Sequence, residues 1–253
     1  MTTRDHRPPA GAPRWRLIDD IGSDASTDHM RTDVELLEQV VADGQPALRL
    51  YTWSEPTLSL GRFQDRADVD EAACEELGVR IVRRPTGGAA LLHGADLTYS
   101  VSLSLPSGAD GGVRAVYDVI ARALIAGLEL IGVTAAIARN DGPPGAVCFA
   151  GQQGADLRVG DRKVCGSAQV RRDGAVLQHG SILLRRLEID ECDVVRTDCD
   201  HDALLRATVT LEELAAPSDP RSVADAIVKG FARSLPVSFD PAVLVPQRSY
   251  AQH

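Results

Sequence analysis

The sequence predicts an α+β fold, because hairpin patterns occur beside separate helical patterns along the same chain. The hairpin evidence is the segment "DLRVGDRKVCGSAQVRRDGAVLQHGSILL", where Gly160-Asp161 and Asp173-Gly174 stand where two-residue turns are expected. The helical evidence is "VRAVYDVIARALIAGLELIG". Its apolar residues recur every three to four positions and form a core stripe, made of Val116, Ile120, Leu124, Leu128 and Ile131.

The first part of the chain predicts several strands and two helices. The strands are expected at "RWRLID", "PALRLYTW", "TLSLG", "VRIVRRP" and "DLTYSVSLSL". The last one alternates apolar and polar residues and reads as a half-buried strand, with one face made of Leu97, Tyr99, Val101, Leu103 and Leu105. The first helix, "DASTDHMRTDVELLEQVVADG", ends at Gly44, and its apolar stripe is Met30, Val34, Leu37 and Val41. The second, "DVDEAACEELG", is short and acidic and ends at Gly78.

The later elements follow from similar signals. The stretch "DGPPGAVCFAGQQGA" contains two prolines and four glycines, which predicts a loop. Thr210 and Glu213 have the spacing of a helix capping box, and "SVADAIVKGFARSL" reads as a C-terminal helix. We expect one catalytic domain over 14–240, a disordered tail at 1–13 and a C-terminal tail at 241–253.

Composition excludes several classes of protein. The 253 residues are 44% hydrophobic and carry a net charge of −9, which argues against a nucleic-acid binder. Apolar runs are interrupted by charge or glycine, so no membrane span is expected, and the polar start does not read as a signal peptide. Five irregularly spaced cysteines without a CxxC pair predict neither a disulfide framework nor a metal site. A cytoplasmic location is therefore expected.

Three clusters could carry chemistry. In "RRPTGGAALLHG", paired glycines let the backbone approach a ligand, although a plain glycine turn is the commoner case. Lys163 is notable because Lys229 is the only other lysine among 27 basic residues, and an amine, unlike a guanidinium, can exchange a proton. Cys148 lies in the Gly/Pro-rich loop, where a thiol is more available than on a core stripe, although a typical cysteine is a small buried residue. Cys165 is its competitor as a nucleophile.

Together, "TLSLGRFQ", "RRPTGGAALLHGADLTYS" and "DRKVCGSAQVRRDGAVLQHGSILL" resemble the lipoate–protein ligase A and octanoyltransferase family, which is related to biotin protein ligases. The resemblance runs from about Trp15 to the C-terminal helix. It implies a mixed, largely antiparallel sheet flanked by helices. It also implies that Lys163 is catalytic. The substrate-binding positions that it implies are Arg84, Thr86, Gly87, Gly88, His93, Gly166, Ser167, Gln169, His179, Gly180 and Ser181.

The resemblance also implies a reaction. One octanoyltransferase branch uses a cysteine followed by phenylalanine in the loop before the lysine hairpin, which matches Cys148-Phe149. The expected activity is transfer of an octanoyl group from acyl carrier protein, through a Cys148 thioester, to a lipoyl-domain lysine of glycine cleavage H protein or a dehydrogenase E2. No cofactor is expected. One alternative is a lipoate ligase that uses ATP and magnesium, and another is a non-catalytic homologue that binds acyl chains or partners.

Overall fold

The computed structural model describes residues 12–24, 28–105, 113–138, 156–196 and 199–241. In chain order, its strands are β1 (Arg14–Asp20), β2 (Ala47–Tyr51), β3 (Thr57–Leu60), β4 (Arg80–Arg83), β5 (Leu91–His93), β6 (Asp96–Ser104), β7 (Ala136–Ile137), β8 (Leu157–Val159), β9 (Arg162–Arg172), β10 (Ala175–Leu183) and β11 (Ser238–Phe239). Its helices are α1 (His29–Asp43), α2 (Glu71–Glu76), α3 (Val113–Leu130), α4 (His201–Ala207) and α5 (Pro220–Ser234), with short 3₁₀ turns η1 (Arg66–Asp68) and η2 (Glu191–Asp193).

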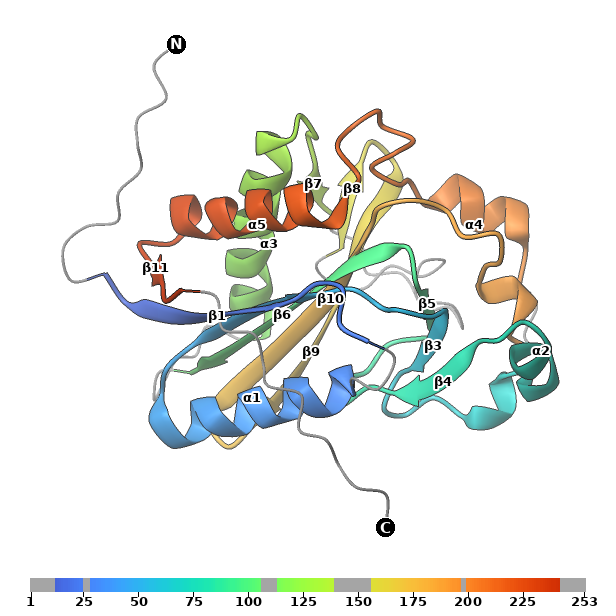
Figure 1. The fold of residues 1–253 in the computed structure, drawn as a ribbon, viewed down its shortest axis with the longest axis horizontal. Coiled ribbons are helices and arrows are strands. Elements are labelled where there is room, and N and C mark those ends of the chain that lie inside the picture. The colour runs from blue at the N-terminus through green and yellow to red at the C-terminus, as the bar shows by residue number, and fades with distance from the viewer. Residues whose placement is uncertain (1–11, 25–27, 106–112, 139–155, 197–198, 242–253) are drawn as a thin grey trace.

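Two sheets organise these elements. The large sheet has the order β11-β1-β2-β6-β10-β9-β8-β7, and the small one has the order β4-β3-β5. Most neighbours in the large sheet are antiparallel, whereas β1 runs parallel to both β2 and β11. Helices α3 and α5 cover one face of the large sheet and α1 covers the other, as Figure 1 shows. The predicted mixed, largely antiparallel sheet flanked by helices is confirmed.

The main core lies between the large sheet and α3 with α5. Ile120, Leu124 and Leu128 of α3 are fully buried, which confirms the predicted stripe. The two helices approach closely where Gly127 faces Gly230, because a Cβ on Gly230 would overlap the backbone of α3. Glycine at both positions therefore allows α5 to lie against α3 and cover the sheet.

The two predicted hairpin turns are confirmed. Gly160 lies between β8 and β9 with φ of 60°, and Asp173 and Gly174 join β9 to β10 with φ of 51° and 75°. Positive φ at both residues is the conformation of a type I′ turn, which matches the twist of the strands. The predicted capping box also forms, because Thr210 and Glu213 exchange backbone-to-side-chain hydrogen bonds of 2.9 and 3.2 Å.

Three expectations need correction. Strand β6 was expected to be half-buried, but residues 96–102 are all buried because the sheet is covered on both faces. In α1, Val41 is 44% exposed and Val40 is buried instead, because the helix turns its Asp33 side toward a buried arginine. The expectation of no disulfide is wrong for Cys192 and Cys199, which the loop between η2 and α4 brings together in a disulfide with Cα atoms 5.1 Å apart.

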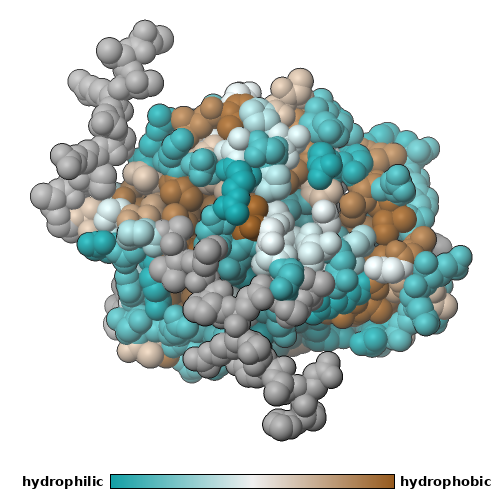
Figure 2. Space-filling view, in the orientation of Figure 1, coloured by the Kyte–Doolittle hydropathy of each residue, from teal (hydrophilic) through white to brown (hydrophobic). Residues whose placement is uncertain are grey.

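The surface is mostly hydrophilic on the face drawn in Figure 2, and hydrophobic residues reach it on the side where α4 lies. Within the described ranges, no helix combines the length and apolar character that crossing a bilayer requires. Of the expected tails at 1–13 and 241–253, residues 1–11 and 242–253 lie outside the described residues.

Candidate functional site

A narrow cavity lies where the small sheet meets the α1 side of the large sheet. It encloses about 30 Å³, which is room for at least one water molecule. Seven of the predicted substrate-binding residues line it: Arg84, His93, Gly166, Ser167, His179, Gly180 and Ser181. The other lining residues were not predicted from the sequence: Met30, Tyr51, Ser59, Leu91, Thr98 and Ala168.

Strands β9 and β10 form one wall of this cavity. Their antiparallel register pairs Gly180 with Ser167 and Ser181 with Gly166. Gly180 is required by packing, because a Cβ there would overlap the carbonyl of Gly166 and lie 2.8 Å from the Tyr99 ring. Two side-chain-free positions therefore lie next to each other across the strand pair, and the missing side chains leave room for the backbone of β9, the Tyr99 ring and the end of Lys163.

His93 is held at the cavity by a chain of hydrogen bonds. Its Nε2 lies 2.9 Å from the Ser59 hydroxyl and its Nδ1 lies 3.0 Å from the Asp96 carboxylate, and its ring stacks on Trp53. Burial alone would raise the pKa of Asp96, but His93 and hydrogen bonds from Ser181 and the Gly94 amide hold it below its ordinary value. The carboxylate is therefore ionised and fixes the orientation of the imidazole.

His179 is held in the same way from the other side. Its Nε2 lies 2.7 Å from the Thr86 hydroxyl, and its Nδ1 lies 3.0 Å from the carboxylate of Asp33 on α1. Asp33 also accepts a hydrogen bond from the fully buried Arg49 at 2.8 Å. Thr86 therefore contributes by positioning His179, although it does not line the cavity itself.

His29 completes this buried network in a neutral form. Its Nδ1 lies 2.8 Å from a guanidinium nitrogen of Arg49, and its ring stacks on Tyr51. Burial, together with the nearby Arg49 charge, lowers the pKa of His29 to about 3. The imidazole is thus uncharged at neutral pH, which avoids a second positive charge beside Arg49.

Arg84 shapes the glycine turn. Its guanidinium donates to the carbonyls of Ser59, Gly87 and Ala89 at 2.6–3.2 Å. Gly88 has a φ of 95°, and its carbonyl lies against Gly61, where a Cβ would clash with it. Both glycines of the pair thus serve the fold of the turn: Gly87 accepts from Arg84 and Gly88 packs on the "TLSLG" strand.

Lys163 forms a buried ion pair that the sequence did not reveal. Its Nζ lies 2.8 Å from Asp156 Oδ2, and the two side chains are 2% and 1% exposed. A Cβ on Gly166 would lie 3.2 Å from the same nitrogen, so the ammonium reaches the cavity wall at Gly166. Asp156 precedes β8 without any recognisable motif, and only the fold brings it to Lys163.

The remaining predicted residues have different outcomes. Gln169 lies on β9 but does not line the cavity, and its amide donates to Gln178 at 3.1 Å. Cys165 is fully buried in the main core, so its thiol is inaccessible. Cys148 falls in the segment 139–155, which lies outside the described residues, so its distance from Lys163 stays untested.

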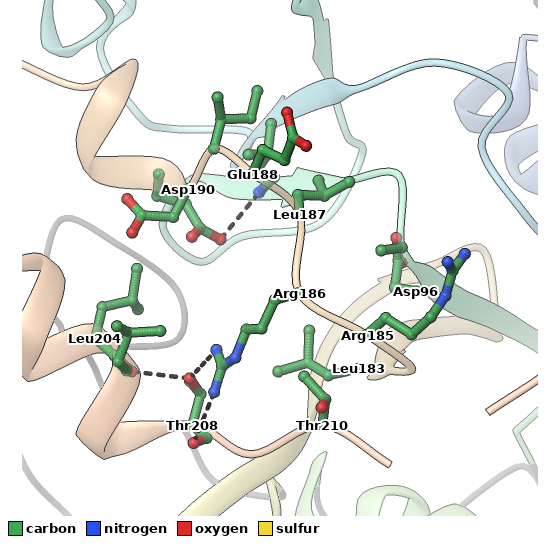
Figure 3. Close-up of a pocket in the computed structure, with 15 residues that line it drawn as sticks. Asp96, Leu183, Arg185, Arg186, Leu187, Glu188, Asp190, Leu204, Thr208 and Thr210 are labelled. Atoms are coloured by element: carbon green, nitrogen blue, oxygen red, sulfur yellow. Dashed lines mark hydrogen bonds between the residues drawn. The ribbon is translucent and has the colours of Figure 1, made fainter. Parts of the chain in front are cut away.

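A second, larger hollow of about 230 Å³ lies beside α4 and was not predicted (Figure 3). Arg186 crosses it and donates to the Thr208 hydroxyl and carbonyl at 2.7 and 3.1 Å, while Leu204 of α4 forms its far side. The amide of Val209, the next residue after Thr208, donates to the Lys163 carbonyl at 2.9 Å. This hollow therefore borders the strand that carries the lysine.

Comparisons with known proteins match this arrangement. A family model for the lipoyl protein ligase A/B catalytic domain matches residues 26–232. The chain belongs to the lipoyl protein ligase A/B family. Within this family the chain is 43% identical over 183 residues to the octanoyltransferase LipM of Carboxydothermus hydrogenoformans, a match that covers 70% of this chain and 67% of that relative.

Two further comparisons show how far the likeness extends, one in sequence and one in fold. The octanoyltransferase LipM of Symbiobacterium thermophilum is 37% identical over 253 residues, covering 91% of this chain and 89% of the relative. The fold matches that of a bipartite lipoate protein ligase from Thermoplasma acidophilum with a TM-score of 0.68 at 21% identity, covering 93% of this chain and 88% of that one. The family assignment thus applies to nearly the whole chain.

Proposed function

We propose that this protein is an octanoyltransferase that moves an octanoyl group from acyl carrier protein, through a Cys148 thioester, to the lysine of a lipoyl domain. The observation that carries the proposal is the 37% identity to an octanoyltransferase across 91% of the chain. The cavity adds support, because its lining combines apolar Met30 and Leu91 with polar side chains, and the Lys163 nitrogen lies against Gly166 of its wall.

The first half-reaction forms the acyl-enzyme. The Cys148 thiolate attacks the thioester carbonyl, the bond to the carrier's sulfur breaks, and the carrier leaves as a thiolate that takes up a proton. The Lys163 ammonium stabilises the negative charge on the carbonyl oxygen during this step. A donor of this kind lowers the activation free energy by roughly 3 kcal/mol. Asp156 pairs with the ammonium at 2.8 Å and holds it in place.

The second half-reaction transfers the acyl group to nitrogen. The neutral amine of the acceptor lysine attacks the Cys148 thioester, an amide bond forms, and the cysteine leaves as a thiolate. The amine loses one proton, which the departing thiolate or solvent takes up. Lys163 thus acts on the carbonyl oxygen in both halves.

The acyl chain enters by parting the cavity walls. The cavity opens to the surface and holds about 30 Å³, which is less than an eight-carbon chain fills, so we expect side chains to move aside where the chain enters. Met30 is the natural candidate, since its unbranched side chain has three rotatable bonds. The acceptor is glycine cleavage H protein or a dehydrogenase E2 lipoyl domain, both of which present a lysine for acylation.

The test is octanoyl transfer to a lipoyl domain, measured by intact mass with and without ATP. The wild-type chain is expected to transfer from octanoyl-carrier protein without ATP and to show an octanoyl adduct on Cys148. Cys148→Ser is expected to lose turnover, whereas the matched control Cys74→Ser retains it, since burial raises the pKa of that thiol and keeps it unreactive.

Other outcomes would overturn the proposal. Transfer that requires ATP and survives Cys148→Ser would identify a lipoate ligase. Binding of the carrier protein or the acyl chain without turnover would identify a non-catalytic homologue. An adduct on Cys165 would move the nucleophile to the core strand.

A further inference from the structure

Four side chains with metal-ligating atoms meet where η2 approaches the start of α4. Ligand atoms of Asp190, Cys192 and His201 all lie within 4.8 Å of one another, and Cys199 joins them through its disulfide to Cys192. Among the residues that the structure describes, this is the cluster whose side chains could hold a metal ion. It lies outside the acyl cavity and no step of the proposed transfer uses it.

The chain order brings these ligands together in two pairs. Asp190 and Cys192 are separated by one residue, and so are Cys199 and His201, at opposite ends of one loop. The Asp190 carboxylate accepts from the Cys192 amide at 2.8 Å and lies 2.9 Å from His201 Nδ1. The side chains of each pair therefore already face the other pair.

The base of this loop is rigid. Val194 and Val195 are buried in the core of the small sheet, and the Val194 carbonyl accepts from the Asp70 amide at 2.9 Å. Val195 also bridges Val69 in an antiparallel pair. A site on such a base is pre-organised, because binding a metal costs little further ordering of the backbone.

We propose that the reduced form of this chain binds one zinc ion through Cys192, Cys199, His201 and Asp190. Two thiolates, an imidazole and a carboxylate form a donor set that suits tetrahedral Zn²⁺. Bond lengths of roughly 2.0–2.3 Å to the metal place such ligand atoms about 3–4 Å apart. The present separations require only a small closure, together with parting of the two sulfur atoms.

The disulfide and the metal exclude each other. A dithiol reductant supplies two electrons and two protons to the Cys192–Cys199 bond and becomes a disulfide itself, which leaves two free thiols. Zinc then replaces the two thiol protons, which pass to solvent. Either state ties η2 to α4, so the cluster links the two elements in both oxidising and reducing conditions.

The position of the cluster gives this link a structural consequence. Glu191, between two of the ligands, accepts a hydrogen bond at 3.0 Å from the amide of Leu92 on β5. The next residue on that strand is His93 of the acyl cavity. Asp190 and Leu204 also line the hollow of Figure 3, so the zinc ion holds one rim of that hollow as well.

The test is Co²⁺ titration of the full-length chain after reduction with a metal-free phosphine and removal of chelators. We expect one Co²⁺ per chain with a thiolate-to-cobalt charge-transfer band, and displacement of the band by Zn²⁺. Cys192→Ser is expected to lose the band. His201→Ala is expected to weaken binding at least about tenfold, and His201 is 55% exposed, so this variant should fold normally.

Cys74→Ser is the matched control, because Cys74 is a free cysteine outside the cluster and its loss should leave the band intact. The disulfide form of the wild type, prepared without reductant, should give no band. The proposal is overturned if the reduced wild type binds no metal. It is equally overturned if the band persists in Cys192→Ser or appears in the disulfide form. Because the readout is metal binding, its failure is distinct from failure of octanoyl transfer.

Discussion

Replacing Asp156 by asparagine removes the carboxylate that faces the buried ammonium of Lys163. The two charged atoms are 2.8 Å apart and the side chains are almost completely excluded from solvent. At an effective dielectric constant of about 20, their attraction is roughly 6 kcal/mol before desolvation is counted. Breaking a buried pair by removing one partner costs about 3–5 kcal/mol, because the remaining charge stays desolvated. We expect Asp156→Asn to lower the free energy of unfolding by that amount.

The double variant separates the ion pair from simple packing. Lys163→Met removes the charge and keeps an unbranched side chain, and Asp156→Asn with Lys163→Met leaves no buried charge in this pair. We expect the double variant to lose less unfolding free energy than the two single variants lose together, by about 2 kcal/mol or more. Urea unfolding followed by tryptophan fluorescence and circular dichroism measures all four proteins.

The exposed ion pair of Arg66 and Glu71 provides the control. Both side chains are more than half exposed, so Glu71→Gln should change the free energy of unfolding very little. The reasoning is refuted if Asp156→Asn costs less than about 1 kcal/mol, or if the single effects add without coupling. In octanoyl transfer, Lys163→Met should lose activity even where it remains folded.

Three further substitutions test other features. Burial raises the pKa of Glu191 from 4.5 to about 7, so the folded state favours the protonated carboxyl. This preference contributes about 3 kcal/mol to the free energy of unfolding below pH 4.5, and the contribution is lost as pH rises through 7. Glu191→Gln should abolish this loss in thermal unfolding from pH 4 to 8, whereas exposed Glu188→Gln should keep the wild-type slope. Gly180→Ala should lower the free energy of unfolding by about 1–3 kcal/mol and reduce octanoyl transfer, because its Cβ meets backbone and the Tyr99 ring. Gly87→Ala is the control: its Cβ meets nothing within 4 Å, so it should leave the free energy of unfolding unchanged in the same urea assay. Gly230→Ala should separate α5 from α3 and lower the melting temperature, and an unchanged value would contradict the close helix packing.

Local patterns predicted the elements because each pattern is enforced by nearby residues. The α3 stripe follows from a 3.6-residue period and the I′ turn at Asp173-Gly174 from the need for positive φ, and both are present. The same reasoning misplaced the buried side of α1. An apolar stripe cannot show that Asp33 faces inward, because its partners lie on other elements: Arg49 on β2 and His179, 146 residues away, on β10.

Only some of the residues that line the cavity were predicted, because local patterns do not show which distant residues meet in the fold. His93 and Gly180 were found from the motifs that contain them. Ser59 lies inside "TLSLGRFQ" but was not singled out, and Met30 lies in no motif, so only the fold shows that both reach the cavity. Arg84 was expected to bind substrate. It lines the cavity, and its guanidinium also holds the glycine turn, which no spacing could reveal because the accepting carbonyls belong to the folded backbone.

The sequence by itself determined the family and the fold class and singled out Lys163, since these depend on residue type, order and spacing along one chain. The tertiary structure alone decided that Lys163 is paired with Asp156, that the histidines are held by buried carboxylates, and that Cys192 and Cys199 meet. Pairing of buried charges and thiols depends on distances across the fold. Those distances are set by how the sheets and helices pack, and residue order does not contain them.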